Sequence, residues 1–253
     1  MALNSIDAKM LSKMFLAGAK NLEVKKEWIN ELNVFPVPDG DTGTNMTMTI
    51  MAAAKEVASM DEPDMTTLCK AISSGSLRGA RGNSGVILSL LFRGLSKRLK
   101  GCTEADGTTW AEALQEGVDA AYKAVMKPAE GTILTVARLA AAKAREAARE
   151  NNFIEFVHEA ALAEAKVALA STTDMNPVLK KANVVDAGGK GWLFALEAML
   201  SSMQGSDVVV PEGAEGGEVK DAADFSDFDT DDITFTYCTE FIIDRENDND
   251  PEK

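Results

Sequence analysis

The chain has 253 residues, a hydrophobic content of 45% and a formal net charge of −14. Most of this charge lies at one end, because residues 206–253 contain 16 Asp or Glu and 3 Lys or Arg, a net of −13. The first 205 residues therefore carry a net charge of only −1. Nucleic acid is excluded as an expected partner, because binding its phosphates requires an excess of basic residues.

Histidine and cysteine are too scarce for several kinds of site. The single histidine, His158, disfavours a Ser-His-Asp hydrolase and a zinc site. Three widely spaced cysteines do not indicate a disulfide framework. No apolar run approaches the roughly 20 residues of a transmembrane helix, and the N-terminus lacks the pattern of a signal peptide. We therefore expect a cytoplasmic protein with reduced thiols.

Apolar residues recur at helical spacing through most of the first 205 residues, without convincing period-two alternation before residue 230. This pattern predicts helices at residues 5–24, 23–32, 45–60, 65–77, 84–100, 109–126, 132–150, 152–171 and 192–203, with a short turn or helix at 175–181. Thr44 or Asn45 is the expected cap of the third helix, and Asp64 is the expected cap of the fourth. His158 lies mid-helix and is predicted to be structural. Leaving aside the short helix at residues 23–32, the fold prediction is all-α with about eight helices.

The composition changes after Gln204, which divides the chain into three parts. Residues 1–205 form the predicted helical domain. Residues 206–232 are rich in Gly, Glu and Asp, which predicts a disordered acidic linker. Residues 233–243 alternate β-branched and aromatic side chains and are predicted to form a strand. A single strand has nothing to pair with, so residues 233–253 are interpreted as the start of a following domain that this chain does not contain.

The stretch at residues 33–46 carries the strongest chemical signal. Asp39 and Asp41 are separated by one glycine and stand directly before a predicted helix, whose N-terminus attracts anions. A polar turn is the simplest alternative. An EF-hand loop does not fit, because Ile50 replaces its final glutamate, and a phosphatase loop does not fit, because two prolines spoil the required strand. We favour magnesium binding by Asp39 and Asp41, with Asn33 as a further oxygen ligand.

Residues 73–85 contain four glycines and two arginines. Asn83 and Ser84 are positioned to present donors to a phosphate at the start of a helix. Small residues at this density are also typical of close helix packing. Arg78 and Arg81 suit phosphate binding and surface roles equally well.

Two further stretches are weaker when taken alone. Residues 127–132 place Gly131 and Thr132 at a helix start, which is also typical of an ordinary capped turn. Residues 183–191 are predicted to form a loop, and their glycines are equally consistent with a turn and with a ligand-binding loop.

Taken together and in order, these stretches resemble a known family. The motifs are NVFPVPDGDTGTNM at residues 33–46, LRGARGNSGVI at 77–87, EGTIL at 130–134 and VDAGGKG at 185–191. They closely resemble the N-terminal nucleotide-binding domain of bacterial fatty acid kinase, in the family typified by the dihydroxyacetone kinase L subunit. The resemblance covers about residues 5–204, and residues 235–243 resemble the beginning of the next domain of fatty acid kinase.

The resemblance implies an antiparallel helical barrel that holds ATP and two magnesium ions at one end. Asp39 and Asp41 match the family's metal aspartates and are the expected catalytic centre. Asn33 aligns with a further metal aspartate of the dihydroxyacetone kinase pattern. The residues that match parts of the family's nucleotide site are Thr42, Gly43, Thr44, Asn45, Asn83, Ser84, Gly131, Thr132, Asp186, Ala187, Gly188 and Gly189.

The implied activity is transfer of the γ-phosphoryl group of ATP to a fatty acid carboxylate. A DegV-like carrier protein presents the fatty acid, and the product is an acyl phosphate for phospholipid synthesis. Because the following domains are absent from this chain, we expect nucleotide binding to persist and turnover to be weak. The alternatives are a component of a dihydroxyacetone-type kinase and a non-catalytic nucleotide-binding module. The sequence leaves open whether the protein forms a homodimer.

Overall fold

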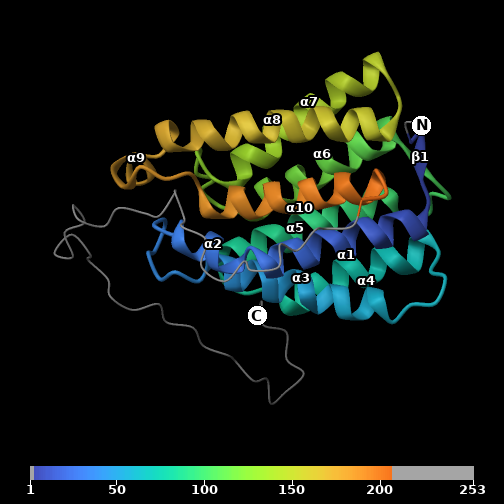
Figure 1. The fold of residues 1–253 in the computed structure, drawn as a ribbon, viewed down its shortest axis with the longest axis horizontal. Coiled ribbons are helices and arrows are strands. Elements are labelled where there is room, and N and C mark those ends of the chain that lie inside the picture. The colour runs from blue at the N-terminus through green and yellow to red at the C-terminus, as the bar shows by residue number, and fades with distance from the viewer. Residues whose placement is uncertain (1–2, 207–253) are drawn as a thin grey trace, which may run out of the picture.

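The structure, a computed structural model, describes residues 3–206, which fold into a bundle of α-helices (Figure 1). The helices are α1 (Ala8–Val24), α2 (Lys26–Glu31), α3 (Thr42–Ala58), α4 (Met65–Gly79), α5 (Gly82–Leu99), α6 (Gly107–Ala124), α7 (Ile133–Glu150), α8 (Ile154–Met175), α9 (Pro177–Ala182) and α10 (Ala187–Met203). Two short strands, β1 (Ser5–Ile6) and β2 (Ala105–Asp106), pair antiparallel. All helices in this range except α2 and α9 have 15 to 22 residues, so the all-α prediction is confirmed.

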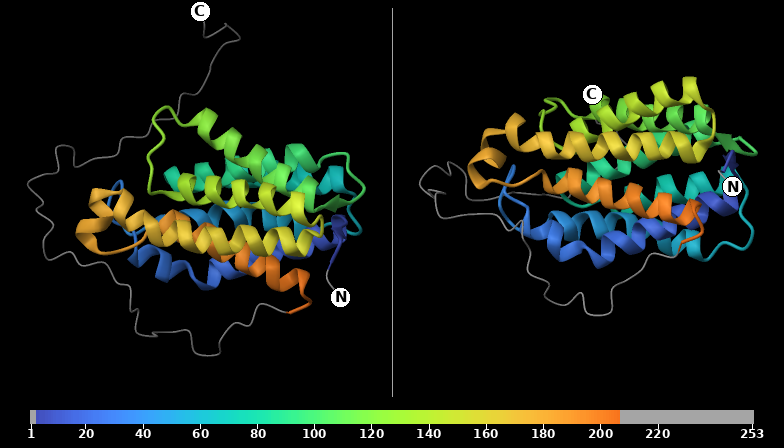
Figure 2. Two further views of the ribbon diagram at one scale, coloured as in Figure 1. Left: turned by 90° about the horizontal axis from the view of Figure 1, so that it is seen from above. Right: turned by 45° about the horizontal axis from the view of Figure 1, so that its top comes forward.

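Successive long helices run in alternating directions, so their ends gather at two poles (Figure 1, Figure 2). One pole holds α2, α9 and the N-termini of α3, α5, α7 and α10, and we call it the α2/α9 end. The other pole holds the β1–β2 pair. Short connections between the long helices enforce this up-and-down arrangement.

The long helices close into a ring around one core. α3 packs against α1, α4 and α5, and the series continues through α5, α6, α7 and α8. α10 closes the ring by packing against α1, α7 and α8. It is buried on most sides because nearly all of its residues are apolar or small.

The third helix begins earlier than predicted. α3 starts at Thr42 and not at residue 45, and Asp41 occupies its N-cap position. The expected capping by Thr44 or Asn45 is therefore wrong, since both residues lie inside the first turn. The connection at residues 32–41, which carries Asp39 and Asp41 and which we call the aspartate loop, is accordingly shorter than the sequence indicated and ends directly at α3.

Two other helix starts follow ordinary capping chemistry. Asp64 caps α4 as predicted, accepting a hydrogen bond from the Thr67 backbone N at 2.8 Å. Asp7 caps α1 in the same way through the Met10 backbone N, also at 2.8 Å. The prediction that the first helix includes residues 5–7 is wrong, because Ile6 pairs with β2 instead.

The predicted strand at residues 233–243 and nearly all of the predicted linker at 206–232 lie outside the described residues. The division of the chain into three parts therefore stays a prediction.

His158 is buried in α8 between two hydrogen-bond partners. Its Nδ1 accepts from Trp110 Nε1 at 3.1 Å, and its Nε2 lies 2.9 Å from the Leu196 carbonyl oxygen. Because Nδ1 accepts, the ring proton belongs on Nε2, which donates to Leu196. Burial lowers the pKa of His158 to about 4, although the hydrogen bond to Leu196 opposes this shift. The prediction that this histidine is structural is confirmed.

We expect His158 to make folding stability depend on pH in acid. The unfolded chain protonates this residue below about pH 6.5, whereas the folded protein resists protonation until its pKa of about 4. Stability is therefore lost as the pH falls through this window, by up to about 3 kcal/mol. His158→Gln removes this titration. The free energy of unfolding, measured with urea, should therefore fall more steeply for wild type than for the variant between pH 6.5 and pH 4. A difference in free energy of unfolding between wild type and variant that stays constant with pH would contradict burial of a neutral imidazole.

Candidate functional site

Four connections at the α2/α9 end, together with the helix starts that follow them, overlap the stretches that the sequence singled out (Figure 1). They are residues 32–41 before α3, 80–81 before α5, 125–132 before α7 and 183–186 before α10. Four helix N-termini therefore share one end of the molecule, and a helix N-terminus carries a partial positive charge. Such an end attracts anions, phosphate among them.

Asn33 is buried and holds the aspartate loop in place. Its Nδ2 donates to Asp39 Oδ1 at 2.6 Å and to the Val37 carbonyl oxygen at 3.2 Å. Its Oδ1 accepts from the Thr42 hydroxyl at 2.8 Å. One amide thus connects the aspartate loop to the first turn of α3. Both polar atoms of this predicted metal ligand are already engaged by the protein.

Asp39 lies close enough to Asp41 to affect the protonation of Asp41. Burial raises the pKa of Asp41, a hydrogen bond with the Asn45 side chain opposes the rise, and the nearby Asp39 adds to it. A hard cation beside Asp41 would favour the ionised form of this carboxylate, which burial and Asp39 disfavour. No three His, Cys, Asp or Glu side chains in residues 3–206 group into a metal cage. The two carboxylates offer the oxygen donors that magnesium prefers, and magnesium commonly takes one or two carboxylates together with substrate phosphates.

The predicted phosphate contacts at residues 42–45 form the first turn of α3. Thr42 and Gly43 are buried, and a Cβ at Gly43 would collide with the backbone of α2. The Thr44 backbone N donates to Asn30 Oδ1 at 3.0 Å, and Asn30 Nδ2 donates to the Thr44 hydroxyl at 3.1 Å. Sequence reasoning missed Asn30, because nothing local distinguishes a polar residue on α2 from a surface residue.

The turn between α4 and α5 lies beside the first turn of α3. Gly82 has a φ of +58°, and a Cβ there would collide with the amide of Asn45. Asn83 is exposed and Ser84 is partly buried in the first turn of α5. The structure therefore brings two of the predicted phosphate-binding stretches together at this end.

The glycines of residues 73–85 also pack the helices closely. A Cβ at Gly75 or Gly79 of α4 would meet alanines of α3, and a Cβ at Gly85 of α5 would meet Thr49. The alternative prediction of close helix packing is confirmed for these three positions.

The two arginines of this stretch differ. Arg78 forms an ion pair with Glu56 on the surface. Arg81 is exposed, and its Nη1 donates to the Ala80 carbonyl oxygen at 2.8 Å. The side chain of Arg81 therefore stays beside the turn between α4 and α5, whereas the side chain of Arg78 pairs with a residue of α3.

In the connection before α7, Gly131 and Thr132 are buried and hydrogen-bonded within the protein. The Gly131 backbone N donates to Thr135 Oγ1 at 2.9 Å, and the Thr132 hydroxyl donates to the Ala129 carbonyl oxygen at 2.8 Å. Gly131 has a φ of +75°, and a Cβ there would approach Met175 to 2.9 Å. The turn is compact, and its residues open α7 at the α2/α9 end.

The prediction of a loop at residues 183–191 is wrong for its second half, because α10 already begins at Ala187. Ala187, Gly188 and Gly189 are buried in its first turn. A Cβ at Gly189 would lie 2.9 Å from Val136 of α7 and 3.1 Å from Leu169 of α8. These glycines let the start of α10 pack between two helices.

Asp186 caps α10 and ties it to its neighbours. Its Oδ2 accepts from the Gly189 backbone N at 2.7 Å, and its own backbone N donates to Thr172 Oγ1 at 3.0 Å. Burial raises the pKa of Asp186 to about 6, although backbone hydrogen bonds from Gly189 and Ile133 oppose the rise. This aspartate therefore has a structural role at the same end as the aspartate pair.

A family model for the DAK2 domain matches residues 36–201, more than half of the chain. The chain belongs to the DAK2 domain family. The match includes Asp39 and Asp41 and extends through the connection before α10, so all four predicted stretches lie within the DAK2 domain or overlap its first residues. β1, α1 and α2 precede the matched region.

Relatives of this DAK2 protein are considerably longer. Protein YloV of Bacillus subtilis is 46% identical over 250 residues, which cover 96% of this chain and 45% of YloV. An uncharacterized protein of Staphylococcus saprophyticus is 42% identical over 244 residues, which cover 95% of this chain and 44% of that protein. The chain thus spans less than half the length of these curated relatives.

Solved structures show the same fold. A dihydroxyacetone kinase from C. freundii in complex with AMP-PNP and Mg²⁺ matches with a TM-score of 0.59 at 19% identity, over 80% of this chain and 35% of that one. The native form of the C. freundii enzyme matches with a TM-score of 0.55 at 21% identity, over 80% of this chain and 36% of that one. The predicted fold, a helical barrel like that of dihydroxyacetone kinase, is confirmed. Within residues 3–206 of the DAK2 protein, no helix combines the length and hydropathy that a membrane span requires.

Proposed function

We propose that this DAK2 domain binds ATP with magnesium and transfers the γ-phosphoryl group to a fatty acid carboxylate presented by a DegV-like carrier. The product is an acyl phosphate for phospholipid synthesis. One observation carries the proposal: the aspartate pair before α3 shares one end of the molecule with the N-termini of α5, α7 and α10. Carboxylates attract a metal and helix N-termini attract phosphates, so magnesium-bound ATP satisfies both.

The fold comparison supports the nucleotide part of the proposal. The C. freundii dihydroxyacetone kinase was solved with AMP-PNP and Mg²⁺, which are the kinds of ligand proposed for this chain. Because the chain spans less than half of its curated relatives, the acceptor, the carrier protein and the activity of the whole protein are all parts of the proposal.

In this proposal Asp39 and Asp41 bind the magnesium ions. Asn33 positions Asp39 through their 2.6 Å hydrogen bond and is a positioning residue more than a ligand, because its oxygen already accepts from Thr42. Bound magnesium would neutralise the phosphate charge and orient the γ-phosphoryl group.

The remaining residues of the site hold the nucleotide. Residues 42–45 and the pair Asn83 and Ser84 contribute backbone and side-chain donors at two adjacent helix starts, which suits phosphate oxygens. Residues 131–132 and 186–189 are buried at the starts of α7 and α10. Their proposed role is to form the wall of the nucleotide pocket.

The proposed acceptor does not require a general base. A fatty acid carboxylate is ionised at neutral pH, because its pKa lies near that of glutamate, about 4.3. A hydroxyl acceptor would gain more from a base. His158, the single histidine of the chain, is buried between Trp110 and Leu196 and is not available for this purpose. This observation favours a carboxylate over dihydroxyacetone as the acceptor.

The experiment combines binding and transfer. Calorimetry of the chain with ATP should show binding that depends on magnesium. A purified DegV-like protein loaded with fatty acid is then added, and hydroxylamine traps any acyl phosphate. Acyl phosphate supports the proposal, whereas dihydroxyacetone phosphate formed with a suitable partner supports the dihydroxyacetone-type kinase. Binding without transfer to either acceptor supports a nucleotide-binding module, and absence of magnesium-dependent binding rejects all three.

Asn33→Asp tests whether the aspartate loop is built to receive positive charge. Without metal, the new carboxylate faces Asp39 across the present 2.6 Å hydrogen bond, so we expect a loss of roughly 1 to 3 kcal/mol in folding free energy. With magnesium and ATP the third carboxylate gains a cation, so the rise in melting temperature should exceed that of wild type. Asn33→Leu is the control, because it loses the hydrogen bonds without adding charge. Equal behaviour of the two variants would contradict the prediction.

A further inference from the structure

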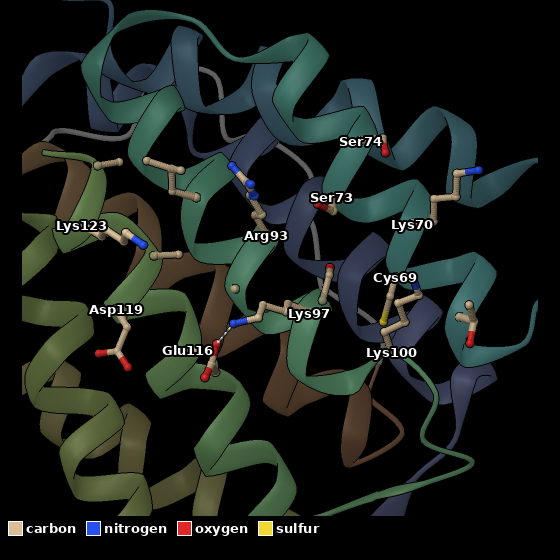
Figure 3. Close-up of a pocket in the computed structure, with 16 residues that line it drawn as sticks. Cys69, Lys70, Ser73, Ser74, Arg93, Lys97, Lys100, Glu116, Asp119 and Lys123 are labelled. Carbon is tan, nitrogen blue, oxygen red and sulfur yellow. Dashed lines mark hydrogen bonds and ion pairs between the residues drawn. The ribbon is translucent and has the colours of Figure 1, made fainter.

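A groove separate from the aspartate loop runs along the outside of α4, α5 and α6 (Figure 3). Its cavity has a volume of about 750 Å³. α5 lies between α4 and α6 and packs against both. Leu90, Arg93, Gly94 and Lys97 recur at helical spacing on α5, so they present one face to the groove.

The groove is basic. Its charged lining residues are Lys70, Arg93, Lys97, Lys100, Lys123, Glu116 and Asp119. Lys97 pairs with Glu116 at 2.8 Å (Figure 3). The other four cations are exposed and form no ion pair within residues 3–206, although many lysines and arginines elsewhere in the domain do. The groove lining thus has five cations against two carboxylates, and four of these cations have no ion-pair partner within that range.

The same chain carries an acidic segment directly after α10. Residues 206–232 contain ten Asp or Glu and a single lysine. Six of the acids recur at every third residue, namely Glu212, Glu215, Glu218, Asp221, Asp224 and Asp227. In an extended chain with three residues per turn, this spacing aligns carboxylates along one edge at intervals of about 9 Å. The sequence therefore places negative charge at a regular spacing along this segment.

We propose that the acidic segment 206–232 of this chain binds in the basic groove between α4, α5 and α6. Charge complementarity carries the proposal, since a row of carboxylates meets four exposed cations that lack an ion-pair partner in the described part of the chain. The bound segment would place residues from 233 onward against this face. The proposal is independent of the proposed phosphoryl transfer, because the groove shares no lining residue with the aspartate loop.

The connection is long enough for this binding. Both α10 and α5 have their C-termini at the β1–β2 end of the molecule. Lys100 of the groove is the residue directly after α5. The 27 residues of the segment can span up to about 90 Å when extended. Because the segment is tethered, its effective concentration near the groove is on the order of millimolar, so individually weak ion pairs suffice.

Cross-linking with a carbodiimide tests the proposal, because this reagent condenses a lysine amine with a carboxylate in contact, with loss of water. In the whole chain at low salt, residues 207–232 should cross-link to Lys70, Lys100 and Lys123. Cross-links to Lys9 and Lys55, which are exposed on α1 and α3, should be rare. High salt should suppress the groove cross-links, because the Debye length falls to about 3 Å at 1 M.

Two matched double variants complete the experiment. Arg93→Glu with Lys123→Glu reverses groove charges, and cross-links to the remaining Lys70 and Lys100 should fall several-fold. Lys9→Glu with Lys55→Glu makes the same change in net charge elsewhere and should leave those cross-links unchanged. Circular dichroism verifies that both variants keep the helical fold.

Three results would overturn the proposal. Cross-links spread evenly over all exposed lysines would show that the acidic segment has no preferred surface. Groove cross-links that persist in the groove variant would exclude charge complementarity as the cause. In a mixture of isotopically labelled and unlabelled protein, cross-links between chains would show that a second copy supplies the segment.

Discussion

Asp41→Ala is expected to abolish the rise in melting temperature that magnesium and ATP give the wild-type chain. Ligand at 100 times its Kd stabilises a protein by about 2.7 kcal/mol, which corresponds to roughly 5 to 10 °C for a domain of this size. Without ligand the variant should be as stable as wild type or slightly more stable. The reason is that Asp41 makes no capping hydrogen bond, and burial and Asp39 disfavour its ionised form. Differential scanning fluorimetry with and without ligand measures both effects.

Asp39→Ala should remove the ligand-induced rise as well, but it also removes the acceptor of the Asn33 hydrogen bond. Some loss of stability without ligand is therefore expected for this variant. Asp64→Ala is the matched control, because Asp64 caps α4 through Thr67 at the opposite end of the molecule. It should melt at a lower temperature than wild type in both conditions and keep the full rise. An unchanged rise in Asp39→Ala and Asp41→Ala would remove the aspartate pair from the ligand site.

Gly94→Ala is expected to be one of the most destabilising small substitutions in the domain. A Cβ at this position would collide with the carbonyl oxygen of Glu116 and approach the Gly117 Cα to 2.5 Å, where α5 crosses α6. Backbone atoms cannot rotate away, so the helices must separate. We expect a loss of roughly 2 to 4 kcal/mol, somewhat above the usual cost of overpacking.

Gly18→Ala makes the same chemical change within α1 and serves as the control. Its Cβ would meet Ala195 and Met199 at 3.5 Å or more, which is ordinary van der Waals contact. Alanine favours a helix over glycine by about 1 kcal/mol, so this variant should be as stable as wild type or more stable. Urea unfolding of both variants measures the difference. Similar free energies of unfolding for the two would contradict the close crossing of α5 and α6.

The aspartate loop illustrates what residue types alone indicate. Asp39 and Asp41 follow two prolines and precede a helix, and this pattern is enough to predict a carboxylate pair at a helix N-terminus. The environment of the pair depends on tertiary structure. The buried amide of Asn33 bonds Asp39 and Thr42 at once, and this arrangement requires the loop to fold back on α3.

The start of α10 shows where local propensity misleads. Glycine costs about 1 kcal/mol relative to alanine inside a helix, so Gly188, Gly189 and Gly191 predict a loop. In the folded domain a Cβ at Gly189 would lie 2.9 Å from Val136, and Cβ atoms at Gly188 and Gly191 would be crowded by Ile133 and Met46. Close packing between helices offsets the low propensity, and this gain exists only once the helices meet.

The sequence by itself determined the all-α class, the number of long helices, the structural histidine and the acidic character of the end of the chain. These properties follow from periodicity, capping residues and composition, which are local. Only the tertiary structure decided that four connections meet at the α2/α9 end, that Asn30 occupies the polar groups of Thr44, and that exposed cations of α4, α5 and α6 line one groove. These features join residues that are distant in the chain, and no local pattern specifies such contacts.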